Sequence, residues 1–403
     1  MHFRFLHTAD LHLDSPLRSL ALRDPDLAEL IADASRSTLR RIVDLALSAQ
    51  VDAVLIAGDL YDGQQTSMKT ARFLAAQLSR LGPAGIRVFL IRGNHDAEAT
   101  ITRELTFPDH VHIFGSKPGI ELIETATQRI AIHGLSFRNR HAPDSLLPHY
   151  KPPVRDARNI GLMHTSLNGA PGHDPYAPCA LADLQASGFD YWALGHIHKR
   201  AEYPGKPHIV MPGIPQGRDI GESGAGSVTL ATLTDDGVTT ETRIVAEAGF
   251  ARVAVDVTGL SDWRELRDRI ANALDAARLP VPHLVARLVL RGETDLTARL
   301  WRDSDLALAE AQEAARAVGG VWVEKLSLDL SRTPPKSGAL GDLAQLIRDE
   351  VQTSPSYADA LETLRRDLEH ALPPDARDAV AAISPEQIET GLAEILARLS
   401  GER

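Results

Sequence analysis

Five short motifs between Asp10 and His198 each place a side chain suited to metal binding directly after an apolar run. In chain order they are Asp10-Leu-His12, Gly58-Asp59-Leu-Tyr-Asp62, Gly93-Asn94-His95-Asp96, His164 and Gly195-His196-Ile-His198. Each motif alone occurs by chance, but five in this order are hard to obtain by accident. Open α/β sheets bind ligands at the carboxyl ends of their strands, so we expect these side chains to form one cluster at such an edge.

The residue types in the motifs suit a pair of divalent cations. One carboxylate, such as that of Asp59, can bridge two ions, and a mixture of Asp, Asn and His donors fits manganese, iron or zinc better than calcium. Cys179 is the only cysteine, so a structural zinc site built from thiolates is the weaker interpretation. Two cations about 3.5–4 Å apart lower the pKa of a bridging water and neutralise charge on phosphate oxygens. The motifs therefore predict hydrolysis of a phosphoester.

The order of the motifs resembles that of the calcineurin-like metallophosphoesterases. Residues 4–16, Arg-Phe-Leu-His-Thr-Ala-Asp-Leu-His-Leu-Asp-Ser-Pro, are similar to the opening of SbcD-related bacterial DNA repair exonucleases, particularly those of the YhaO type. Residues 164–169, 172–178 and 212–218 are also similar to stretches of that group. The resemblance implies an α/β fold, a four-layer αββα sandwich followed by a small α+β capping domain and C-terminal helices.

The resemblance also implies a role for each motif residue. A first metal ion would be held by Asp10, His12, Asp59 and His198, and a second by Asp59, Asn94, His164 and His196. His95 would be no ligand but the residue that steadies the transition state or protonates the leaving oxygen, with Asp96 as its orienting partner. The alternative is that His95 only orients a ligand. The role of Asp62 stays open, because an aspartate there can simply cap the helix that follows.

Apolar runs and helical patterns alternate through residues 1–245, the expected metallophosphoesterase domain. The runs that predict buried strands are residues 3–6, 53–57, 88–91, 130–132, 160–163 and 192–194. Apolar residues at helical spacing lie between several of these runs, and one such set is Leu39, Ile42, Val43 and Ala46. This alternation predicts an α/β domain.

The pattern changes after residue 246. Residues 252–257, 283–291 and 321–330 predict strands, and residues 263–277 and 303–318 predict helices. The resemblance identifies this βαβαβ module, residues 246–332, as a capping domain that helps to choose duplex substrates. The alternative is a stabilising lid that makes no contact with substrate.

Residues 333–338, Thr-Pro-Pro-Lys-Ser-Gly, predict a linker before a helical region at residues 340–403. Three apolar helix faces are expected there, formed by Leu343, Leu346, Ile347 and Val351, by Leu361, Leu364 and Leu368, and by Ile388, Leu392, Ile395 and Leu399. Such helices usually pack on their own domain. The resemblance implies instead a docking arm for an SbcC-like ATPase of the YhaN type. A second copy of the chain, in a homodimer, is a further expected partner.

The charge balance bears on the substrate. Lys and Arg total 43 against 54 Asp and Glu, a net charge of −11, which is unusual for a protein that grips a polyanion. Bound cations would neutralise several acidic groups, and only the local field near the site guides a phosphate. The candidate DNA contacts are Arg138, Arg140, Lys199, Arg200, Arg218 with Gln216, and His173.

The motifs and the resemblance together predict a manganese-dependent DNA exonuclease or endonuclease. A small-molecule or cyclic-nucleotide phosphodiesterase would keep the same metals, and the acidic charge suits it. A protein Ser/Thr phosphatase is disfavoured, because Gly63 follows Asp62 where those enzymes usually have arginine. The N-terminus shows no cleavable signal, and no segment reaches the length of about 18 uninterrupted apolar residues that spans a bilayer, so a cytoplasmic enzyme is expected.

Overall fold

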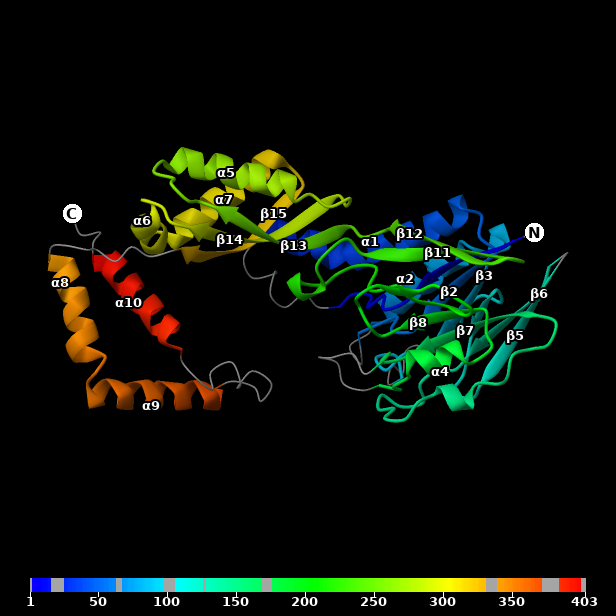
Figure 1. Cartoon of the computed structure of the whole chain (residues 1–403). Coiled ribbons are helices and arrows are strands. Elements are labelled where there is room, and N and C mark those ends of the chain that lie inside the picture. Colours follow the sequence, from blue (N-terminus) through cyan, green and yellow to red (C-terminus); the bar gives the residue numbers. More distant parts are fainter. Residues whose placement is uncertain are drawn as a thin grey trace. The chain divides into compact units, whose positions relative to one another are not determined.

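The chain divides into two compact units. The first comprises Met1–Ala251 with Arg278–Val285, and the second comprises Arg252–Ala277 with Ala286–Arg403. The computed structural model describes residues 2–15, 25–62, 67–97, 106–125, 128–168, 176–330, 339–371 and 384–399 (Figure 1). None of the helices in these ranges combines the length and the apolar character needed to cross a membrane.

The first unit is built on two six-stranded sheets, in the strand orders β12-β11-β1-β2-β3-β4 and β5-β6-β7-β8-β10-β9. Sheet one contains β1 (Phe3–Thr8), β2 (Ala53–Ala57), β3 (Arg87–Ile91), β4 (Val111–Ile113), β11 (Ser227–Thr234) and β12 (Gly237–Ile244). Sheet two contains β5 (Gly119–Glu124), β6 (Arg129–Gly134), β7 (Arg158–His164), β8 (Tyr191–Gly195), β9 (Ala201–Tyr203) and β10 (His208–Met211). Strands β1 to β3 run parallel, as do β6 to β8, so their carboxyl ends share an edge in each sheet.

All six apolar runs that predict strands in this unit are strands. The run at residues 53–57 coincides with β2, and the others lie within β1, β3, β6, β7 and β8. Several strands extend beyond their runs because polar residues complete the ladder, as His164 does opposite Gly195. The apolar runs do not reveal β5 or β12, because these edge strands carry mostly exposed or half-exposed side chains.

Successive side chains of sheet one point to opposite faces and so build two cores. On one face, Phe5, Leu55 and Phe89 pack against Ile132 and Leu162 of sheet two. This contact joins the sheets face to face and leaves their other faces to be covered by helices and loops.

Helices cover sheet one on its outer face. These helices are α1 (Pro25–Ser48) and α2 (Met68–Ser79) (Figure 1). The predicted helix face is buried against the sheet and consists of Leu39, Ile42, Val43 and Ala46. Over sheet two, Met163 and Trp192 are covered by α4 (Leu181–Gln185) and by loops. The layers are helix, sheet, sheet and helix, which confirms the expected fold, with the thinner helical layer on sheet two.

The second unit is centred on a three-stranded sheet in the order β13-β14-β15. Its elements are β13 (Ala248–Asp256), α5 (Trp263–Ala276), β14 (His283–Gly292), α6 (Thr297–Arg302), α7 (Ser304–Val318) and β15 (Val321–Leu330). Helices α5 and α7 pack against each other, and α7 packs against β15. The predicted strands and helices are present, and the short helix α6 is additional.

The second unit ends in helices. In order they are α8 (Ala339–Leu346), the π-helical turn η5 (Ile347–Val351), α9 (Pro355–Ala371) and α10 (Pro385–Leu399). Helix α10 packs on α6 and α8, where Leu392 and Leu396 are buried beside Ala344. The prediction of the apolar face of α10 is therefore wrong in part, because Ile395 and Leu399 are 54% and 46% exposed.

Helix α9 buries none of its side chains. On its expected apolar face, Leu361 is half-buried, whereas Leu364 and Leu368 are 54% and 39% exposed. The described part of the chain thus leaves this face uncovered. The predicted linker at residues 333–338 lies outside the described residues.

Candidate metal centre

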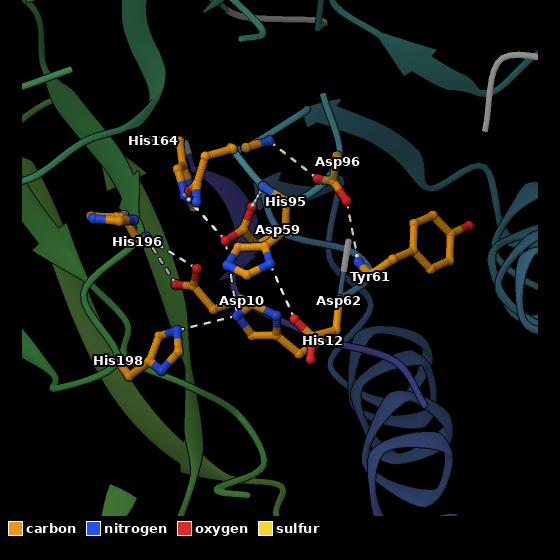
Figure 2. Close-up of polar contacts among 12 residues, drawn as sticks. Asp10, His12, Asp59, Tyr61, Asp62, His95, Asp96, His164, His196 and His198 are labelled. Carbon is orange, nitrogen blue, oxygen red and sulfur yellow. Dashed lines mark hydrogen bonds and ion pairs between the residues drawn. The ribbon is translucent and has the colours of Figure 1, made fainter. Parts of the chain in front are cut away.

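The five motifs come together at strand ends of both sheets (Figure 2). Sheet one contributes, from the segments after β1, β2 and β3, the residues Asp10, His12, Asp59, Asp62, Asn94, His95 and Asp96. Sheet two contributes, from the end of β7 and the segment after β8, the residues His164, His196 and His198. The cluster thus depends on the face-to-face packing of the two sheets.

The backbone of the cluster is strained. The φ angles of Asp10, His12, Asp59 and His196 are 54°, 39°, 52° and 100°, in a left-handed region that residues other than glycine rarely adopt. Each such residue costs about 1–3 kcal/mol, and the conformation persists only where the surrounding structure imposes it. Here the backbone N–H of Asp10 donates to the carbonyl of Gly58 at 2.9 Å. Strain concentrated in this way is typical of a functional site.

Two glycines allow the motif loops to approach one another. A Cβ atom at Gly58 would lie 2.5 Å from Nδ1 of His164, and one at Gly93 would overlap Oδ1 of Asp59. Any side chain at either position would displace a polar group of the cluster. The Gly-Asp and Gly-Asn pairs in the motifs therefore have a steric cause.

Asp10, His12 and His198 form the first group of potential metal donors, with donor atoms within 4.8 Å of one another. The two Nε2 atoms of His12 and His198 lie 3.2 Å apart. Imidazole nitrogens bind zinc at about 2.0–2.1 Å, so two that share an ion at near right angles lie about 3 Å apart. The backbone N–H of His196 donates to both oxygens of Asp10, at 3.1 and 3.0 Å, and fixes that carboxylate. This group has the spacing and chemistry of a metal site.

Asp59, His164 and His196 form a second group. Nδ1–H of His164 donates to the carbonyl of Ala57 at 2.9 Å, which leaves Nε2 to face Oδ1 of Asn94 at 2.9 Å and Oδ2 of Asp59 at 3.4 Å. Burial, the largest single effect, lowers the pKa of His164, but the charges of Asp59 and Asp10 and the hydrogen bonds with Asp59 and Ala57 together raise it to about 9. The pocket therefore favours a cation, which a proton on Nε2 or a metal ion can supply.

The carboxylate of Asp59 belongs to the second group and also faces the first. Its Oδ2 is 3.9 Å from Nε2 of His12 and 3.4 Å from Nε2 of His164. Burial alone would raise the pKa of Asp59, but His164 and His12 hold this pKa well below its usual range. Asp59 is thus an ionised carboxylate that can reach a cation in either group.

His95 is paired with Asp62. Its Nδ1 lies 3.1 Å from Oδ1 of Asp62, and the hydroxyl of Ser15 donates to Oδ2 of Asp62 at 2.7 Å. The hydrogen bond with Asp62 raises the pKa of His95 against the effect of burial. His95, Asp62 and His12 also form a third group of potential donors. The structure therefore places Asp62 in the site, whereas the N-cap of α2 is Ser67.

The prediction that Asp96 orients His95 is wrong. The carboxylate of Asp96 accepts the backbone N–H groups of Leu60, Tyr61 and Gly93, at 3.0, 3.1 and 3.1 Å (Figure 2). Burial and the charge of Asp59 raise the pKa of Asp96 to about 7. Asp96 thus ties the turn after β2 to the turn after β3, and Asp62 is the carboxylate that contacts the ring of His95.

Two arginines that the sequence offers as DNA contacts are already paired within the chain. Nη2 of Arg218 donates to Oε1 of Glu222 at 2.7 Å, and Nη2 of Arg200 donates to Oε2 of Glu202 at 2.7 Å. Carboxylates of the chain thus hold both guanidinium groups, and the role of Arg200 and Arg218 as DNA contacts stays a prediction. Gln216 is buried and donates to the carbonyl of Ala248, so the prediction that Gln216 contacts DNA is wrong.

Other predicted DNA contacts remain exposed. The side chains of Arg138, Arg140 and Lys199 are exposed, and no described residue forms an ion pair with them. Arg138 follows Phe137, whose ring meets that of His164 edge-on with 5.6 Å between the centroids. This basic segment therefore lies beside the cluster. His173 lies in a segment that the structure does not describe.

Glu222 is a residue of the site that the motifs do not reveal. It ends the short 3-10 helix η4 (Ile220–Glu222), and its Oε1 accepts Nδ1–H of His198 at 2.6 Å. Burial raises the pKa of Glu222, but hydrogen bonds from His198 and Arg218 outweigh burial and lower it to about 2. The only signal in the sequence is an arginine four residues earlier, a spacing that ordinary ion pairs share.

The amino-acid sequence matches two protein families. Residues 3–200 match the calcineurin-like phosphoesterases, and residues 250–331 match the middle domain of metallophosphoesterase YhaO. The chain is also 35% identical over 303 residues to a relative from Bacillus subtilis (strain 168), covering 74% of this chain and 72% of the relative. The chain therefore belongs to the calcineurin-like metallophosphoesterases, phosphoester hydrolases that use divalent metal ions. The Bacillus relative is described as an uncharacterized metallophosphoesterase, YhaO, so the resemblance to the YhaO type is confirmed.

More distant relatives carry the description DNA double-strand break repair protein Mre11. That of Methanocaldococcus jannaschii is 27% identical over 205 residues, which cover 49% of this chain and 51% of the relative. That of Haloferax volcanii is 27% identical over 269 residues, which cover 66% of this chain and 58% of the relative. Among solved structures, TT1561 of Thermus thermophilus is similar with a TM-score of 0.37 and 14% identity, over 60% of this chain and 99% of that chain.

Proposed function

We propose that the protein is a two-metal nuclease that hydrolyses phosphodiester bonds in DNA. The observation that carries the proposal is the placement of Asp59 between two groups of metal donors. The choice of DNA rests on the Mre11 relatives, whose descriptions place them in double-strand break repair. A cytoplasmic location suits this activity.

The two ligand sets that the resemblance implies extend the two donor groups, with Asp59 added to the first group and Asn94 to the second. The first ion would be held by Asp10, His12, Asp59 and His198, and the second by Asp59, Asn94, His164 and His196. When bound, the pair of ions supplies an activated water and neutralises charge on the phosphate. Nitrogen donors beside carboxylates favour manganese over magnesium, so manganese is the proposed metal. Asp59 is the shared ligand.

His95 holds the proton for the leaving oxygen in this proposal. Its ring lies beside that of His12, with 5.1 Å between the centroids, and its Nδ1 is engaged by Asp62. The remaining nitrogen, Nε2, is then the one that carries a proton toward substrate. Because the hydrogen bond with Asp62 raises the pKa of His95, the ring keeps this proton to a higher pH than an ordinary histidine.

The nuclease proposal is tested with end-labelled duplex, single-stranded and hairpin DNA beside a chromogenic phosphodiester, each with manganese, magnesium or a chelator. We expect manganese to support degradation of duplex DNA and the chelator to abolish it. The exposed Arg138, Arg140 and Lys199 are the proposed phosphate contacts. Turnover of the small diester alone would favour a small-molecule or cyclic-nucleotide phosphodiesterase, which the net charge of −11 suits. Full activity in chelator would contradict a metal-dependent mechanism.

We also propose that α9 docks an SbcC-like ATPase. The support is its uncovered row of Leu361, Leu364 and Leu368, because an apolar stripe on one face of a helix fits a groove or a partner helix. The double substitution Leu364→Glu and Leu368→Glu is expected to weaken capture of the purified ATPase at least tenfold. Burial of each leucine side chain in the interface would contribute about 1.5–3 kcal/mol to binding, and the glutamates would remove this contribution.

Binding and cleavage are measured separately in this test. Cleavage of DNA by the variant alone should match that of the unaltered protein. The control is Arg366→Glu, which places the same charge on the opposite, exposed face of α9. Unchanged capture of the ATPase by the double variant would contradict the docking role of α9.

A further inference from the structure

A carboxylate and an imidazole form a short contact at the edge of the first donor group. Nδ1–H of His198 donates to Oε1 of Glu222 at 2.6 Å, and the two side chains are 19% and 13% exposed. Nε2 of the same ring lies 3.2 Å from Nε2 of His12. The two nitrogens of His198 thus have different partners, a carboxylate on one side and the donor group on the other.

Glu222 is held from several directions. Nη2 of Arg218 donates to Oε1 at 2.7 Å, and the backbone N–H of Arg218 donates to Oε2 at 2.7 Å. Asp219 precedes the 3-10 helix and accepts the backbone N–H of Gly221 at 2.6 Å, which fixes the turn that carries Glu222. A carboxylate held in this way constrains the ring to which it is bonded.

We propose that Glu222 is a positioning residue that sets both the tautomer and the orientation of His198. An ionised carboxylate only accepts hydrogen bonds, so it keeps the imidazole proton on Nδ1 and directs the lone pair of Nε2 toward the first ion. Arg218 acts one step further away, by holding Glu222. The inference rests on the proposed two-metal centre, and it gives Arg218 a function within that centre.

The chain supplies a matched control. Nε2 of His208 lies 2.9 Å from Oε1 of Glu202, and Arg200 donates to Oε2 of Glu202 at 2.7 Å. This group has the same three residue types as His198, Glu222 and Arg218. His208, however, belongs to none of the donor groups found among the described residues. Loss of the carboxylate at Glu202 should therefore leave metal binding unchanged.

The test is titration of the full chain with manganese after removal of metal by a chelator, followed by calorimetry or by the paramagnetic signal of free manganese. The unaltered protein should bind two ions. Glu222→Ala should weaken one of the two sites by about 10–100-fold and leave the other as it is. Glu222→Gln should lose less manganese affinity at that site, because its amide oxygen still accepts the Nδ1–H of His198. Glu202→Ala should bind both ions as the unaltered protein does.

A second measurement does not require metal. Nitrogen NMR of the metal-free chain should show His198 with its proton on Nδ1 and a mixture of tautomers in Glu222→Ala. Two tight sites in Glu222→Ala, an equal loss at both sites, or an unchanged tautomer would each overturn the role of Glu222 while the two-metal centre stands. Fewer than two ions bound by the unaltered protein would overturn the centre itself, and this inference with it. Glu222→Gln keeps the test decisive should the alanine variant unfold.

Discussion

Replacement of Asp59 by asparagine is expected to lower kcat for DNA cleavage by about 10³-fold or more. The amide removes the negative charge that lies between the two donor groups, where Oδ2 is 3.9 Å from Nε2 of His12 and 3.4 Å from Nε2 of His164. A metal pair contributes several kcal/mol of charge stabilisation in the transition state, and about 4 kcal/mol corresponds to a factor of about 10³. Turnover at saturating manganese and the number of bound ions should both fall.

Asp52→Asn is the matched control for this substitution. Asp52 precedes the same strand, β2, at the end far from the cluster, and accepts the backbone N–H of Arg4 at 2.7 Å. An amide oxygen can accept that hydrogen bond too, so activity and metal content should stay as they are. An Asp59→Asn protein that binds two ions and cleaves DNA at an undiminished rate would show that Asp59 does not bridge.

His95→Asn is expected to keep both ions bound and to lower kcat by about 10²–10⁴-fold, the usual reach of general acid catalysis. The ring is not among the proposed ligands, and its Nδ1 contacts Asp62 at 3.1 Å. Single-turnover cleavage and a manganese titration on the same sample measure the two effects. Loss of one ion would instead make His95 a ligand, as its membership of a third donor group with His12 and Asp62 allows.

Asp62→Asn tests the same role through pH. The hydrogen bond with Asp62 raises the pKa of His95, so the asparagine variant should have a lower pKa at His95. A general acid works in its protonated form, and activity falls as pH rises through its pKa. The alkaline fall of kcat should therefore move to lower pH in Asp62→Asn. A fall that stays in place or moves to higher pH would contradict the acid role.

The sequence predicts the site residues whose positions are set by the ends of strands. Residues that come directly after neighbouring buried parallel strands meet at one sheet edge, so Asp10 and Asp59 are found together as expected. His164 ends a strand of the other sheet and joins them because the two sheets pack face to face. In the core, the apolar run at residues 192–194 likewise predicts β8, the strand that carries the buried Tyr191.

The sequence could not predict the contacts that depend on the conformation of loops. Asp96 is next to His95 in the chain, but its backbone conformation turns the carboxylate toward amide groups, and Asp62 reaches the ring from another loop. Glu222 meets His198 because a 3-10 turn brings it there. Helical spacing likewise cannot decide which half of an amphipathic face is covered, so Leu396 rather than Ile395 is buried in α10.

The origin of the donors in two separate sheets has a thermodynamic consequence. An ion that binds the folded chain and not the unfolded chain adds a stabilising free energy of RT ln(1 + [L]/Kd), about 2.7 kcal/mol at a hundredfold excess over Kd. The proposed ions would each take ligands from the loops of both sheets, so they would act as cross-links between the two halves of the sandwich. The lifetime of the folded protein in a cell would then depend on the local supply of metal. Scarcity of metal would lower both the activity of the enzyme and the amount of folded enzyme.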